Sequence, residues 1–97
     1  FGYIEQINRV GDETTLRVQL VDMIQDDTMP NNYRLEDLEI ANVTVSIDAL
    51  MYALEGVTPV KINDIDELNE IVNKHRRLFI FTIINDNAVL ITEQYLP

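Results

Sequence analysis

The chain of 97 residues contains no cysteine, no tryptophan, one histidine and three glycines. Without cysteine it can form no disulfide, thiolate nucleophile or thiolate metal site. A single histidine rules out a metal site built from several histidines of one chain, and three separate glycines do not make a phosphate-binding loop. No apolar run approaches the roughly 20 residues that cross a bilayer, so we expect no direct membrane insertion.

Positive charge is also scarce, since 7 Lys and Arg residues face 17 Asp and Glu residues and give a formal net charge of −10. Such a field repels nucleic-acid phosphates and anionic lipids, so we expect no nucleic-acid partner. An acidic surface suits cations and basic proteins, and it also favours solubility. Because 46% hydrophobic and 25% charged residues are ordinary globular composition, the chain is expected to form a single domain over 1–97.

Alternating apolar and polar residues predict strands in the first half of the chain, over 1–10 and 14–24, with a turn at Gly11 and Asp12 between them. Residues 25–32 are rich in turn formers and predict a loop.

The middle of the chain is less uniform. The segment 33–40 fits a short helix and an irregular strand entry equally well. Residues 41–47 alternate clearly, with Ile47 among the side chains expected to point inward. Residues 50–62 contain good helix formers, but their alternation around a turn at 55–58 favours a hairpin.

One helix is predicted over about 64–75, with Asn63 as its N-cap. Its apolar residues form a single stripe made of Ile65, Leu68, Ile71 and Val72. The basic run from Lys74 to Arg77 is expected to lie at its C-terminal end, where the helix dipole favours positive charge.

The chain closes with a predicted hairpin of strands 78–84 and 88–97, in which Pro97 ends the last strand. Both faces of 78–84 are apolar, so we expect both to be covered. The sequence therefore predicts an α+β domain that is mostly antiparallel β. About six strands in hairpins form a small, partly open barrel, with the helix before the last hairpin.

Residues that could carry catalysis are few. His75 lies in the basic run and is explained by helix capping, and Ser46 stands alone on the polar face of a strand. Acidic groups near 26–27, 64–67 and 85–87 are explained by turns and by the helix start. We therefore expect no catalytic residue, no cofactor and no metal site, with weak calcium binding as an open alternative.

Three residues near the ends of predicted elements are the candidate binding residues. Tyr33 and Tyr95 are flanked by polar or turn residues, and half-exposed tyrosines are common interface anchors. Glu93 is expected to face solvent on the last strand. We therefore expect Glu93→Gln to cost almost nothing, whereas Phe81→Ala should cost about 3–5 kcal/mol.

Four stretches, "FGYIEQI", "MPNNY", "VSIDALMYAL" and "LFIFTIINDNAVLITEQYLP", together resemble a family of small uncharacterised domains from exported proteins of Gram-positive bacteria. The chain departs from that family after "NNY", where "RLEDLEI" replaces the usual aromatic extension. The resemblance implies a secreted or surface-anchored, lipoprotein-type location, and it implies no activity, cofactor or catalytic residue.

The function expected from the sequence is that of a non-catalytic extracytoplasmic module. Its partner would be a protein or a cell-envelope component, and the chain would be a monomer or a weak homodimer. One alternative is a small barrel that carries a compact apolar ligand. A less favoured alternative is a hydrolase that uses Glu93 with another acid or with His75.

Overall fold

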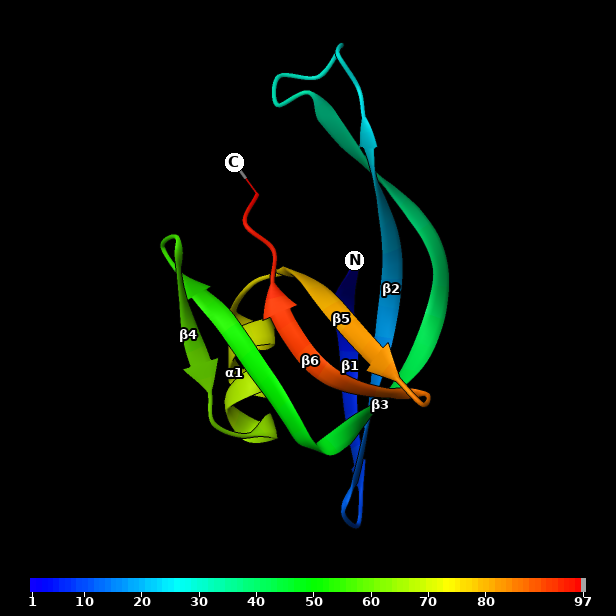
Figure 1. Ribbon diagram of the computed structural model, residues 1–97, viewed down its shortest axis with the longest axis vertical. Coiled ribbons are helices and arrows are strands. Elements are labelled where there is room, and N and C mark those ends of the chain that lie inside the picture. The colour runs from blue at the N-terminus through cyan, green and yellow to red at the C-terminus, as the bar shows by residue number, and fades with distance from the viewer. Residues whose placement is uncertain (97) are drawn as a thin grey trace.

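The computed structural model describes residues 1–96, which form six strands and one helix (Figure 1). The elements are β1 (Gly2–Val10), β2 (Glu13–Gln25), β3 (Tyr33–Glu55), β4 (Thr58–Ile62), α1 (Ile65–Lys74), β5 (Leu78–Ile84) and β6 (Asn87–Glu93). The expected class is confirmed, because the fold is mostly antiparallel β with one helix before the last hairpin. Within residues 1–96 no helix is both long enough and apolar enough to span a membrane.

The strands form one sheet that curls into a partly open ring. Their order is β2-β1-β5-β6-β3-β4, and β2 also pairs with β3, so five strands close the ring and β4 lies outside it. The ring is weakest between β1 and β5, which pair only at Gly2–Phe79 and Tyr3–Leu78. The pairing of β3 with β6 is parallel. This is the connectivity of small, partly open OB-type Greek-key barrels, an architecture that serves many functions.

Three hairpins turn at the predicted positions, each through a two-residue loop. Gly11 and Gly56 have φ of +61° and +64° at the first central position, which identifies type II′ turns. Asn85 and Asp86 are both left-handed, with φ of +52° and +67°, which identifies a type I′ turn.

The core lies inside the ring and extends under the helix. Its fully buried side chains come from β2, α1, β5 and β6 and include Leu16, Val18, Leu68, Phe79 and Ile91. The other three residues of the helix stripe pack against this cluster, which confirms the predicted apolar face.

The ends of α1 differ from the prediction. The N-cap is Asp64, whose carboxylate accepts a hydrogen bond from the Glu67 amide at 2.8 Å, whereas Asn63 donates its side-chain amide to the Glu67 carboxylate. The helix ends at Lys74, with His75 as C-cap in an extended conformation. Arg76 and Arg77 therefore lie beyond the helix, where they are free to reach other elements.

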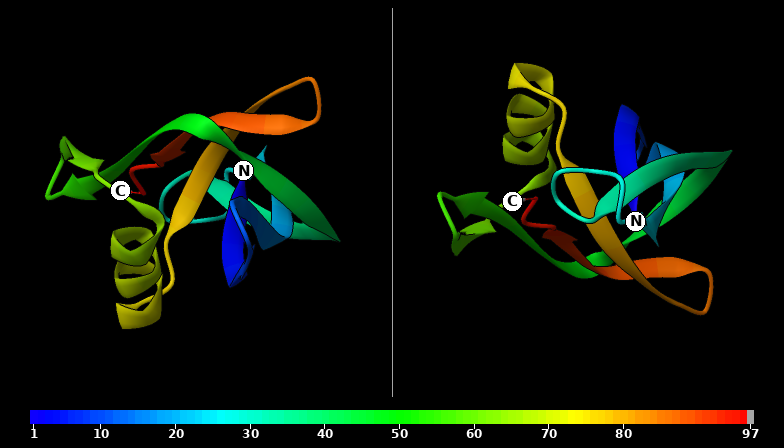
Figure 2. Two further views of the ribbon diagram at one scale, coloured as in Figure 1. Left: turned by 90° about the horizontal axis from the view of Figure 1, so that it is seen from below. Right: turned by 90° about the horizontal axis from the view of Figure 1, so that it is seen from above.

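Strand β3 is continuous over 23 residues, so 33–40 is strand and not helix. Its first part pairs with the end of β2 in a long arm that gives the molecule its 47 Å axis (Figure 1). Farther along, β3 bends sharply where its pairing with β6 is interrupted between Val45 and Leu50 (Figure 2). The bend turns Ile47 outward to 88% exposure, so its predicted inward position is wrong.

The last hairpin also departs from expectation in two respects. Leu78 and Phe79 are buried, but Ile83 and Ile84 at the other end of β5 are exposed, so only the first half of this strand is covered on both faces. Strand β6 ends at Glu93. The strand-ending role predicted for Pro97 falls outside the described residues.

The loop at the tip of the arm supports a prediction about Asp26. Its carboxylate accepts hydrogen bonds from the hydroxyl of Thr28 at 2.6 Å and from the Thr28 amide at 3.0 Å, and these bonds hold its pKa below 3.8. We expect Thr28→Val to move the pKa of Asp26 back toward 3.8, as measured by NMR titration of the carboxyl carbon. A wild-type Asp26 that titrates at or above 3.8 would contradict this prediction.

The same shift has a consequence for stability. Because the pKa of Asp26 is lowered in the folded loop, its stabilising contribution is present above the unfolded pKa of about 3.9 and is lost as the pH falls through the folded value. Loosening of the arm tip is therefore expected only in acid.

Candidate functional site

The three residues predicted to bind a partner do not form one site. Tyr33 begins β3 on the arm and is partly buried, whereas Tyr95 follows β6 and is 49% exposed. Within residues 1–96 no hydrogen bond, ion pair or cavity joins either tyrosine to Glu93. The two tyrosines are both near turn residues in the sequence, but the structure does not bring them together with Glu93.

Glu93 does not face solvent, so that prediction is wrong. Its carboxylate accepts a hydrogen bond from Arg77 Nη1 at 2.8 Å and another from the amide of Leu54 at 2.9 Å. The side chains of Arg77 and Glu93 are only 16% and 14% exposed, and Arg77 also donates to the Leu54 carbonyl at 3.3 Å. The reason is the parallel pairing of β3 with β6, which places Leu54 beside the end of β6. Glu93 therefore links Arg77, which precedes β5, to Leu54 of β3.

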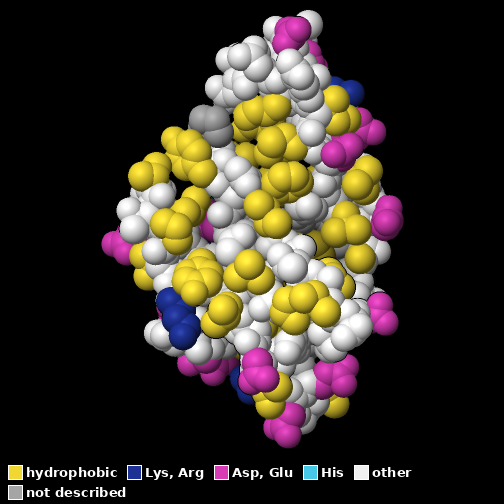
Figure 3. All heavy atoms as spheres, in the orientation of Figure 1, with side chains coloured by type: hydrophobic (Ala, Val, Ile, Leu, Met, Phe, Trp, Pro, Cys, Tyr) yellow, Lys and Arg dark blue, Asp and Glu magenta, His cyan; other side chains and the backbone are white. Residues whose placement is uncertain are grey.

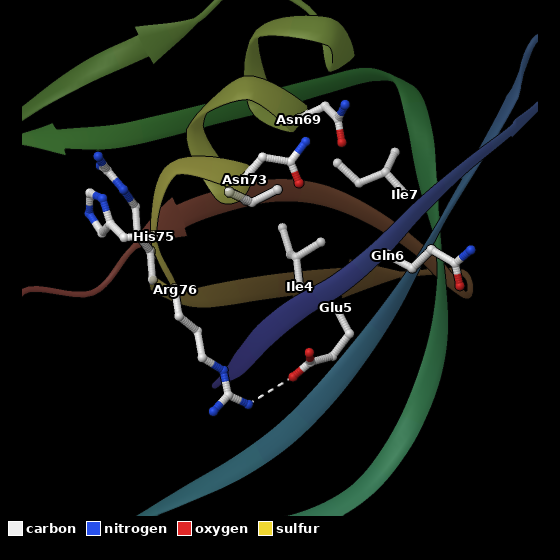
Figure 4. Close-up of a pocket in the computed structure, with 10 residues that line it drawn as sticks. Ile4, Glu5, Gln6, Ile7, Asn69, Asn73, His75 and Arg76 are labelled. Atoms are coloured by element: carbon white, nitrogen blue, oxygen red, sulfur yellow. Dashed lines mark hydrogen bonds and ion pairs between the residues drawn. The ribbon is translucent and has the colours of Figure 1, made fainter.

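A groove between β1 and α1 is the strongest candidate for a functional site. Strand β5 begins at Leu78, opposite Tyr3, so from Ile4 toward its turn β1 pairs with β2 on one edge and with no described strand on the other. Helix α1 occupies the space beside this part of β1 without contacting its backbone closely, and a cavity of about 310 Å³ remains between them (Figure 4).

The walls of this groove, which we call the β1–α1 groove, have distinct chemistry. Its floor is apolar and is made by Ile4 and Ile7 of β1 with Val72 of α1. On the helix side, Asn69 and Asn73 lie one turn apart and extend toward Ile4 and Ile7 (Figure 4). Each asparagine amide offers both a donor and an acceptor, as a peptide unit does.

Two ion pairs bracket the groove along its length. At one end Arg76 donates to Glu5 at 2.7 Å and stacks over the ring of Tyr3, 3.9 Å from its centroid. At the other end Arg9 lies 3.4 Å from Asp66. Both pairs are exposed, so each contributes little to stability, and their positions show that β1 and α1 lie antiparallel.

The groove collects much of the small positive charge in this acidic chain. Arg9, Lys74, Arg76 and Arg77 are four of the seven Lys and Arg residues. Three of them follow one another with His75 at the C-terminal end of α1, beside one end of the groove. Glu5 and Glu93 neutralise Arg76 and Arg77 at that end, so Lys74 leaves it weakly cationic in a molecule whose formal net charge is −10.

Sequence reasoning missed this groove, although one signal for it was present. The run from Lys74 to Arg77 was explained by the helix dipole alone, which needs basic residues only in the last turn. A run that continues beyond the last helical turn indicates further partners. The partners of Arg76 lie on β1, more than 70 residues away in the chain, whereas Arg77 pairs with Glu93 at the end of β6.

A second concavity lies on the face of the ring beside the arm. It has a volume of about 380 Å³ and is mostly apolar, with Phe1, Leu20, Val43, Phe81 and Ile83 among its lining residues. Figure 3 shows hydrophobic side chains gathered below the tip of the arm and continuing down this face of the molecule. This hollow is shallow and open, and its polar groups are few.

The remaining chemistry of the described residues is sparse. Across residues 1–96 no group of three or more His, Asp or Glu side chains is placed to hold a metal ion. Comparison of the chain with protein-family models, with curated proteins and with solved structures found no match.

Proposed function

We propose that the domain is a non-catalytic module that binds a protein partner in the β1–α1 groove. The observation that carries this proposal is the groove itself, where a strand edge and two helix amides face each other across an apolar floor. Such a surface offers backbone-like hydrogen bonds over several residues, which suits a polypeptide better than a compact metabolite.

The setting of the module belongs to the same proposal. Its resemblance to exported domains of Gram-positive bacteria supports a location outside the cytoplasm, in a secreted or surface-anchored protein. The net charge of −10 and the lack of cysteine are compatible with that location. The charge also disfavours nucleic acid as the partner, which leaves a protein or another envelope component.

Site-specific photocrosslinking tests the proposal. We expect a benzophenone amino acid at Asn73 to form an adduct with a protein in cells of the organism that makes this chain. The matched control is Val57, which is 70% exposed at the tip of the β3–β4 turn and lines no described cavity. The adduct should be absent there.

Two results would contradict the proposal. One is an equal yield of adducts at Asn73 and Val57, because that pattern indicates nonspecific proximity. The other is no protein adduct at Asn73. If the purified domain also retains a small molecule in a native mass spectrum, the result would favour a carrier of a compact apolar ligand in the hollow beside the arm.

A further inference from the structure

The edge of β1 that faces the groove carries free backbone hydrogen-bonding groups. The two-residue turn after Val10 makes Val10 and Glu13 a hydrogen-bonded pair, and by alternation Asn8–Thr15 and Gln6–Arg17 are also hydrogen-bonded pairs. The amides and carbonyls of Ile7 and Arg9 therefore point away from β2, toward α1. Within residues 1–96 no strand pairs with this edge beyond Tyr3.

We propose that the occupant of the groove is an extended peptide segment of the partner, added as a strand to the free edge of β1. This inference rests on the function proposed above and specifies how the partner binds. Ile7 and Arg9 would exchange backbone hydrogen bonds with alternate residues of the peptide. Asn69 and Asn73 would bind its other edge, which a single strand would otherwise leave unpaired.

The charge of the groove selects the side chains of this peptide. Lys74, beside the Arg76–Glu5 pair, makes one end of the groove weakly cationic and complementary to an acidic residue, whereas the surrounding surface is acidic and repels a uniformly acidic segment. The peptide is therefore expected to place one Asp, Glu or terminal carboxylate at that end of the groove and to be neutral or basic elsewhere.

A second copy of this chain fits the edge less well than a separate peptide. Pairing of two β1 edges would bring the two α1 helices together, because each edge is flanked by its own helix. A lone strand brings no second helix to the groove.

The probe for the experiment is a phage-displayed library of random twelve-residue peptides, selected on the purified domain. We expect enriched peptides to share one acidic position, and replacement of that acid by its amide to weaken binding about three- to fivefold. N-methylation along an enriched peptide should weaken binding most, by about tenfold or more, at every second residue, because those amides face β1. It should weaken binding less at the residues between them, whose amides face the side chains of Asn69 and Asn73.

Two variants at Arg9 test whether the free edge of β1 binds the peptide. Arg9→Pro removes the outward amide of β1 but keeps its hydrogen bonds with β2, and it should weaken peptide binding about tenfold or more. Arg9→Ala is the reference variant, because it also removes the exposed pair with Asp66 but keeps the amide, so the difference in affinity between the two variants is the contribution of that amide. Circular dichroism checks that both variants fold.

The outcomes separate strand addition from the broader function. Peptides that bind wild type and Arg9→Pro equally, or an N-methyl scan without alternation, would overturn strand addition but leave a protein-binding groove. A library that yields no enriched peptide would also overturn it, and an absent crosslink at Asn73 would then remove the proposed function as well. A dimer that is lost in Arg9→Pro would assign the edge to a second copy instead.

Discussion

Replacement of Phe79 by Ala is expected to lower the free energy of unfolding by about 3–5 kcal/mol. Phe79 is fully buried and is the largest of the fully buried side chains. It lies where β5 pairs with β1 on one side and with β6 on the other, opposite Gly2 and Glu93. Strands fixed on both sides cannot move inward to fill the space, so most of the cavity should remain.

The matched control for this prediction is Phe81→Ala in the same strand. Phe81 has a ring centroid 6.5 Å from that of Phe79, but it is only partly buried and lines the open hollow beside the arm. Its replacement should therefore cost less than that of Phe79, by about 1 kcal/mol or more. Urea unfolding followed by circular dichroism measures both changes. Equal costs, or a larger cost at Phe81, would show that the core is centred elsewhere.

Glu93→Ala is expected to destabilise the fold by about 2–4 kcal/mol, although the sequence alone suggested a neutral surface position. The substitution removes two hydrogen bonds and leaves the guanidinium of Arg77 largely buried without its counter-ion. The Nε of Arg77 is already buried without a hydrogen-bond partner among residues 1–96. Loss of Glu93 would therefore leave the guanidinium with few remaining hydrogen bonds. Glu93→Gln should cost less, because the amide oxygen can still accept from Leu54.

A double-mutant cycle identifies the origin of this effect. Arg77→Met combined with Glu93→Ala should be less destabilising than the sum of the two single changes, because no unpaired charge remains. Glu5→Gln is the control, since it breaks an ion pair whose side chains are 57% and 40% exposed, and it should cost under about 1 kcal/mol. Additive effects of the two changes would mean that Glu93 and Arg77 are not coupled.

Local chemistry in the sequence was sufficient to predict several elements. The glycines and Asx residues of the tight turns, the acidic start and apolar stripe of α1, and the alternation in β2 each depend on residues adjacent or nearly adjacent in the chain. These features specify strand, turn and helix whatever the rest of the chain does. The predicted class, number of elements and position of the helix follow from them.

The face of β3 that meets the core could not be predicted, because the local sequence makes both faces equally suitable. Around residues 50–54 the two faces of β3 are both apolar, and the structure buries Met51 and Ala53 while Leu50 is 46% exposed. Alternation alone cannot decide which face meets the core. The bend of β3 before Leu50 decides it, and this bend coincides with an interruption in the parallel pairing of β3 with β6.

The candidate site shows the same difference between features set by local sequence and features set by tertiary structure. The sequence by itself determined the acidic surface, the elements and the cationic run after α1, because these depend on composition and short-range pattern. Only the tertiary structure decided that β5 starts opposite Tyr3, that β1 is left with a free edge beside α1, and that Glu93 is paired inside. Strand pairing joins residues dozens of positions apart, and no local preference specifies which distant partner completes an edge or a charge.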